Sequence, residues 1–152
     1  MDTKYQTEIQ VTLDPHYKTV IPYVFVKLDG EERSMVLKDT ETVTFDTLLD
    51  IGPHQLSVWF ENKENSDSTT AVEIKDITIQ GLTLNRVKWA GNYTPQYPEP
   101  WATEQHQQGN PLPKVIPGGH YLGWLGTYTL DFEVPTFTWL HKIENLGWLY
   151  TD

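Results

Sequence analysis

The sequence contains no cysteine, which excludes disulfides, thiolate metal sites and thiol nucleophiles. It also lacks any run of about 18 apolar residues, the length that a membrane-spanning helix requires. Basic residues are few: 11 Lys and Arg stand against 21 Asp and Glu, and the formal charge is −10. Because nucleic-acid binding depends on clustered Lys and Arg, we expect neither a nucleic acid nor a membrane as a partner.

Targeting and linker signals are missing as well. The first ten residues lack the basic start and the apolar stretch of a signal peptide, so we expect no export by an ordinary cleaved signal. No internal repeat or Ser/Gly-rich linker divides the 152 residues. We therefore expect residues 1–152 to form one domain, which is long enough to bury a core of its own.

The sequence also lacks the known motifs of catalytic sites. The sequence has no nucleophile elbow, P-loop or dinucleotide fingerprint. None of its histidines stands at a spacing typical of zinc ligands, and each is interpreted as a surface or capping residue. They are His16, His54, His106, His120 and His141. We expect the chain not to be an enzyme.

Alternating apolar residues, by contrast, occur along most of the chain. In residues 52–61 His54, Leu56, Val58 and Phe60 share one face, and Trp59 points to the other. In residues 71–79 the apolar face changes between Ile74 and Ile77, which indicates a β-bulge or burial of both faces. Further strands are predicted at 5–13, 20–28, 33–37, 41–48 and 120–134.

These short strands, separated by Gly, Pro, Asn and Asp turns, predict an all-β fold, an antiparallel β-sandwich of jelly-roll type. The segment 136–150 fits a strand, a turn at Glu144 and Asn145 and a terminal strand, with a short helix over 138–145 as the alternative. Residues 91–119 contain six of the ten prolines and are predicted to form a long Pro-rich loop. A loop of this length is typical of a functional segment or of one held by a partner.

The paired strands around an acidic loop carry a resemblance. Residues 52–62 read G-x-H-x-L-x-V-x-F-x-N, and V-x-I-x-x-I-x-I-x-G ends at Gly81. This pattern, about 30 residues long, resembles the central strands of calcium-dependent, xylan-binding carbohydrate-binding modules. The resemblance implies a Ca²⁺ site in the loop that joins the strands.

The chemistry of this loop allows two interpretations. Calcium takes six to eight oxygen ligands, and the candidates here are Glu61, Asn62, Asp67 and Glu73. Lys63 places a positive charge among them, and no EF-hand register is present, so a solvated hairpin loop is the favoured interpretation. Calcium is thus a possible cofactor rather than a required one.

Aromatic residues are concentrated in the second half of the chain. Sugars stack on exposed aromatic rings while neighbouring polar side chains bind the hydroxyls. The candidate carbohydrate-binding residues are therefore Trp59, Tyr93, Tyr97 and Trp101. The favoured alternative places most of these rings in the core or at an interface. Trp59 and Trp101 are expected to be exposed. Trp139, His141 and Trp148 are the candidate interface residues.

Most of the chain, and above all its C-terminal part, is similar to small structural proteins of tailed bacteriophages. The quoted segments are TPQYPEPWATEQ and the run from LPKVIPGG to the end. This resemblance implies a virion component, a capsid decoration or tail-associated protein made in the host cytoplasm. Two hypotheses follow. The favoured one is a non-catalytic structural or adhesion module that contacts other virion proteins or itself as an oligomer. The alternative is a carbohydrate-binding module.

Overall fold

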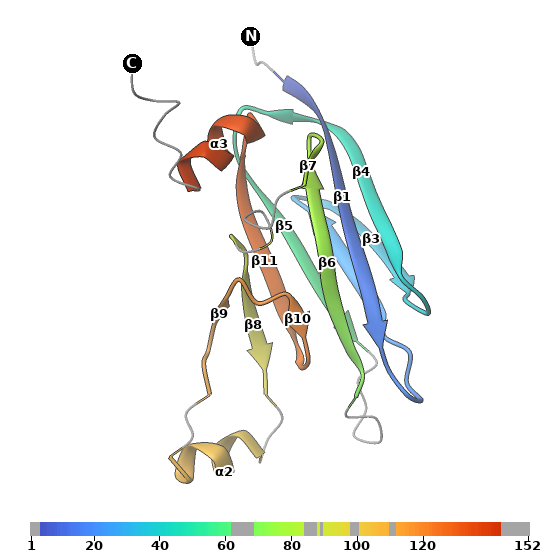
Figure 1. Cartoon of the computed structure of the whole chain (residues 1–152), viewed down its shortest axis with the longest axis vertical. Helices are drawn as coiled ribbons and strands as arrows, with labels where there is room; N and C mark the ends of the chain where they lie inside the picture. The colour runs from blue at the N-terminus through green and yellow to red at the C-terminus, as the bar shows by residue number, and fades with distance from the viewer. Residues whose placement is uncertain are drawn as a thin grey trace.

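The computed structural model describes residues 4–61, 69–83, 88, 90–97, 101–109 and 112–143. Strands dominate these residues and form two antiparallel sheets, which confirms the expected all-β sandwich (Figure 1). The strands are β1 (Lys4–His16), β2 (Tyr23–Leu28), β3 (Glu31–Val36), β4 (Glu41–Asp50), β5 (Gly52–Glu61), β6 (Ala71–Ile79), β7 (Leu82–Thr83), β8 (Asn92–Gln96), β9 (Ile116–Pro117), β10 (Tyr121–Leu122) and β11 (Leu125–Val134). The helices are α2 (Trp101–Gln107) and α3 (Thr136–Ile143).

The chain passes back and forth between the two sheets. The first sheet has the strand order β10-β6-β1-β4, with β7 beside β6, and the second has the order β3-β2-β5-β11-β8-β9. β1 and β4 are therefore neighbours although β2 and β3, which lie between them in sequence, belong to the other sheet. The jelly-roll type, which specifies the connections more finely, stays a prediction.

The core lies between the sheets and is built from every second residue of the long strands. β1 contributes Ile9, Val11 and Leu13, which are fully buried, and the inward residues of β5 and β11 meet them from the other sheet. Trp59 lies on the opposite face of β5, as predicted, but it is half-buried rather than exposed. The period-two pattern therefore identified the inward faces correctly.

The change of apolar face in β6 is a β-bulge. Thr12 of β1 pairs with Asp76 of β6, whereas the next residue, Leu13, pairs with Ile74. Lys75 is thus an extra residue on β6, and Ile74 before it and Ile77 after it both point inward although they are three residues apart. The bulge places Glu73 directly opposite Asp14.

The C-terminal segment differs from its favoured prediction. Residues 136–143 form the helix α3 and not a strand. Trp139 explains the difference, because one helical turn carries its ring back onto Phe132, where the two rings meet edge to face at 6.2 Å. The predicted turn at Glu144 and Asn145 lies outside the described residues.

The Pro-rich segment 91–119 is more regular than a loop. It contains β8, α2 and β9, so its helix was missed. α2 ends with a recognisable signal: Gly109 has a φ of 80°, and its N–H bonds to the carbonyl of His106. Neither helix in the described part of the chain is long and apolar enough to cross a membrane.

The sandwich has two distinct ends. Lys4 pairs with Asp50 and Val134 pairs with Gly52, so the start of β1, the β4–β5 turn and α3 lie together at one end, the α3 end. β1 runs from there to the opposite end, where His16 pairs with Ala71 at the start of β6 (Figure 1). We call this second end the cavity end, because an open cavity lies there.

Candidate functional site

The cavity at the cavity end has a volume of about 770 Å³ and is open to solvent. The end of β1, the β3–β4 turn, the start of β6 and β10 surround it. Its lining residues are 14–18, 38–40, Thr69, Ala71, Tyr121 and Gly123. A cavity of this size falls in the range typical of small-ligand sites.

Side chains from three neighbouring strands meet on the outer face of the first sheet. Glu73 of β6 pairs with Asp14 on one side and with Tyr121 of β10 on the other. His16 lies two residues beyond Asp14 and therefore shares its face of β1. The Tyr121 ring is tilted against the His16 ring at a centroid distance of 5.3 Å, and half of Tyr121 is exposed.

One nitrogen of His16 contacts both carboxylates. Its Nε2 lies 3.2 Å from Oε1 of Glu73 and 3.5 Å from Oδ2 of Asp14. One oxygen of each acid and this nitrogen all lie within 4.8 Å of one another. The three residues form the His16 cluster, which is partly buried and borders the cavity.

The second oxygen of each acid has its own partner. The Thr40 hydroxyl donates a hydrogen bond of 2.6 Å to Oδ1 of Asp14. The ammonium of Lys75, the bulged residue, lies 3.8 Å from Oε2 of Glu73. These contacts orient both carboxylates so that their remaining oxygens face His16.

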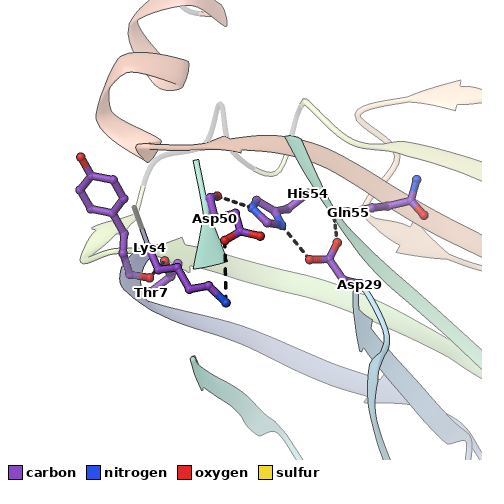
Figure 2. A network of polar contacts seen from close by, with 7 residues as sticks. Lys4, Thr7, Asp29, Asp50, His54 and Gln55 are labelled. Carbon is purple, nitrogen blue, oxygen red and sulfur yellow. Dashed lines mark hydrogen bonds and ion pairs between the residues drawn. The ribbon is translucent and has the colours of Figure 1, made fainter. Parts of the chain in front are cut away.

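A second histidine contacts a carboxylate at the α3 end (Figure 2). Nδ1 of His54 donates to Oδ2 of Asp29 and Nε2 donates to the carbonyl of Asp50, both at 2.7 Å. Oδ1 of Asp29 accepts the N–H of Gln55 at 3.0 Å. Asp29 has a φ of 50° in the Asp29–Gly30 turn, so this network, the His54 cluster, holds the β2–β3 turn against β5.

The pKa of His54 reflects opposing effects. Burial disfavours the charged imidazolium and lowers the pKa, but the hydrogen bonds to the Asp50 carbonyl and the Asp29 carboxylate favour it, as do the charges of Asp29 and Asp50. The balance raises the pKa of His54 above its ordinary value of 6.5.

Trp59 and Tyr93, two of the aromatic residues predicted to bind carbohydrate, lie on opposite faces of the second sheet. Trp59 stacks on Phe25 with a centroid distance of 5.2 Å and an interplanar angle of 6°, so one face of its ring is covered. Tyr93 is only 1% exposed, and its hydroxyl bonds to the carbonyl and the N–H of Trp124. Burial raises the pKa of Tyr93 to about 12. Tyr93 is therefore a core residue without a ring face for a sugar.

The other two candidates lie beside α2. Tyr97 packs edge to face on Trp124 at 5.0 Å and donates a hydrogen bond of 2.6 Å to the carbonyl of Pro113. It borders a smaller cavity of about 290 Å³ that α2 also lines. Trp101 begins α2, and its side chain lies outside the described residues.

Of the predicted calcium ligands, Glu73 belongs to the His16 cluster. Glu61 ends β5 in the second sheet, whereas Glu73 lies in the first. Asn62 and Asp67 lie outside the described residues. The described part of the chain thus places Glu73 with Asp14 and His16, two residues that the sequence did not single out.

The predicted interface residues have different outcomes. Trp139 is 5% exposed and packs on Phe132 within the same chain, so it is covered without any partner. His141 lies in α3, with its side chain outside the described residues, and Trp148 lies outside them altogether. Among the described residues, the most exposed apolar side chains at the α3 end are instead Leu48, Ile51 and Phe137.

Comparison with known proteins finds no matching family model, no matching curated protein and no matching solved structure.

Proposed function

We propose that the chain is a non-catalytic binding module that holds a carbohydrate in the cavity at the cavity end. The observation that carries this proposal is Tyr121, whose half-exposed ring borders an open cavity with polar walls. Sugars present apolar C–H faces to aromatic rings and hydroxyls to polar side chains. Tyr121 supplies the ring, in place of the four aromatic residues that the sequence suggested.

The charges around the cavity support a neutral, hydroxyl-rich ligand. Asp14 and Asp39 supply acceptors, whereas Lys18 and Lys38 supply donors, so the lining carries both signs in similar number. A strongly charged ligand would meet a like charge somewhere on this wall. A sugar hydroxyl both donates and accepts, and it matches such a mixture.

The test is a glycan array followed by calorimetry on the intact chain and on Tyr121→Ala. We expect the variant to lose binding while its unfolding curve stays within about 0.5 kcal/mol of the parent, because the ring is half exposed. Tyr5→Ala is the matched control, since Tyr5 is 37% exposed and lies at the opposite end. A parent chain that binds no glycan, or a Tyr121→Ala variant that binds as tightly, contradicts the proposal.

The same samples test whether the site is non-catalytic. Asp14 and Glu73 are two neighbouring carboxylates, and glycosidases use a pair of carboxylates for acid–base chemistry. We expect a bound oligosaccharide to be recovered intact after prolonged incubation. Release of reducing ends by the parent chain, but not by Glu73→Gln, would make the site catalytic.

A second candidate function is assembly through the α3 end. Leu48, Ile51 and Phe137 are each more than half exposed there, at 56%, 55% and 55%. Exposed apolar side chains near one another are typical of protein contacts. Together with the resemblance to structural proteins of tailed bacteriophages, they support a virion component that is attached at the α3 end and presents the cavity end outward.

Analytical ultracentrifugation tests self-assembly through this surface. We expect the parent chain to form oligomers as its concentration rises, and the triple variant Leu48→Ser, Ile51→Ser, Phe137→Ser to sediment as a monomer. Val36→Ser is the control, because Val36 is also 57% exposed but lies on the edge strand β3. A parent chain that is monomeric at all concentrations contradicts self-assembly.

A further inference from the structure

We propose that Asp14, His16 and Glu73 bind a divalent transition-metal cation of the zinc class, with one coordination position open to the cavity. This site goes beyond the carbohydrate proposal, because it needs no sugar to be detected. It also differs from the calcium site that the acidic loop suggested, since it shares only Glu73 with that set.

The two distances from His16 to the carboxylates match the spacing of ligand atoms around a metal ion. Zinc holds His nitrogen and carboxylate oxygen at about 2.0–2.2 Å with tetrahedral angles, so neighbouring ligand atoms lie about 3.4 Å apart. The two contacts of His16 Nε2, at 3.2 and 3.5 Å, lie on either side of this value. All three atoms lie within 4.8 Å of one another, so one cation could contact all of them once the side chains close around it.

At His16 Nε2 the cluster also has more hydrogen-bond acceptors than protons to share among them. His16 Nε2 carries at most one hydrogen, yet two carboxylate oxygens face it. Asp14 and Glu73 are moreover direct cross-strand partners, an arrangement in which like charges repel. A divalent cation would replace the single proton and neutralise both acids.

The surroundings hold the ligands as supporting residues do in metal sites. Thr40 donates a hydrogen bond to the far oxygen of Asp14, and the Lys75 ammonium forms a longer ion pair, at 3.8 Å, with the far oxygen of Glu73. Such contacts fix the direction of a ligating carboxylate and raise metal affinity. Lys75 is available for this role because the β-bulge makes it an extra residue of β6.

The donor set selects the kind of cation. Calcium and magnesium prefer oxygen ligands alone, whereas imidazole nitrogen suits zinc and its neighbours. Three protein ligands leave the fourth tetrahedral position free, as in sites where water or a substrate completes the coordination. Asp14 and His16 both line the cavity, so that position faces it.

Isothermal titration calorimetry with ZnCl₂, and separately with CaCl₂, tests the proposal on the intact chain after treatment with chelator. We expect one Zn²⁺ per chain and no heat of calcium binding. His16→Gln and Glu73→Gln should each weaken zinc binding by at least about tenfold. His106→Gln is the matched control, because His106 is an exposed histidine on α2, away from the cluster.

Thermal unfolding with and without Zn²⁺ gives a second readout. The midpoint of the parent and of His106→Gln should rise with zinc, since the folded chain alone assembles the site. The midpoints of His16→Gln and Glu73→Gln should not. The proposal is overturned if the parent binds no zinc, if both cluster variants bind zinc as tightly as the parent, or if calcium binds equally well.

Discussion

The His16 and His54 clusters place the same residue types at opposite ends of one sandwich, yet they differ in how their atoms are satisfied. Each ring nitrogen of His54 has an acceptor of its own, and its side chain is only 10% exposed. His16 offers a single nitrogen to two carboxylates, and its side chain is 40% exposed. The first arrangement is complete without a ligand, whereas in the second two carboxylate oxygens share one nitrogen.

This difference teaches how to separate a structural histidine from a binding one. A cluster in which every donor has one acceptor stabilises the fold, and it loses stability when any member is removed. A cluster with surplus acceptors contributes little until a cation arrives. Exposure agrees with this assignment, because the cluster with surplus acceptors borders the open cavity.

The largest expected effect is that of His54→Ala. Its removal leaves the Asp50 carbonyl and an oxygen of Asp29 without their donors, so we expect a loss of about 2 kcal/mol in the free energy of unfolding. His16→Ala, measured by urea denaturation in chelator, should cost less than about 0.5 kcal/mol. Equal losses in the two variants would remove the distinction between the clusters.

Replacing one aspartate in each cluster should change stability in opposite directions. Asp29→Asn weakens the hydrogen bond to His54 and should cost about 1 kcal/mol. Asp14→Asn removes a like charge opposite Glu73 and should stabilise the metal-free chain by about 0.5 kcal/mol. Both substitutions conserve volume, so each is a control for the other in the same denaturation series. Destabilisation by Asp14→Asn would show that its charge already has a partner.

The pH dependence of stability sharpens the comparison. Because the pKa of His54 is raised in the folded chain, its contribution is fully present below its ordinary value of 6.5. The contribution is lost as the pH rises through the higher folded pKa, where the folded chain gives up its extra proton. The difference in unfolding free energy between the parent and His54→Ala should therefore shrink from pH 6 to pH 8, values chosen to bracket that range. A difference that grows with pH would mean a lowered pKa.

Lys4→Ala should have the smallest effect. Its Nζ lies 3.8 Å from the carboxylate of Asp50, and both side chains are more than half exposed, so the ion pair is worth less than about 0.5 kcal/mol. His54 binds the carbonyl of Asp50 and not this carboxylate (Figure 2). Unchanged denaturation midpoints at low and high salt would confirm that Lys4 lies beside the His54 cluster without stabilising it.

The strands could be predicted because their signal is local. Alternation at Ile9, Val11 and Leu13 identifies a buried face within five residues. The phase change between Ile74 and Ile77 indicated a bulge or burial of both faces, and the register shows the bulge. The α3 helix was not favoured, because its formation depends on a contact between Trp139 and Phe132 of the preceding strand. Short segments of this kind take their conformation from the surface they pack on.

The candidate site could not be predicted, since it depends on register. Asp14 and Glu73 are far apart in sequence and meet only because β1 and β6 pair as they do. The sequence singled out Glu73 as a possible calcium ligand near an acidic loop. It gave no sign that Glu73 lies opposite Asp14, because that depends on the pairing of β1 and β6. Nothing in the sequence distinguishes Tyr93 from Tyr121, but only Tyr121 lies on the outer face of its sheet. Neighbouring residues of a strand point to opposite faces, so an error of one residue in the expected register reverses the side on which a ring lies.

The length and position of β1 also have a mechanical consequence. Its 13 residues span about 40 Å, and hydrogen bonds to β4 and β6 hold it on both sides. A force applied at Lys4 and resisted at the cavity end runs along the strand, perpendicular to these bonds, so both ladders are loaded in shear. A chain anchored by the α3 end while its cavity grips a distant surface would therefore carry tension through the most resistant direction of its sheet.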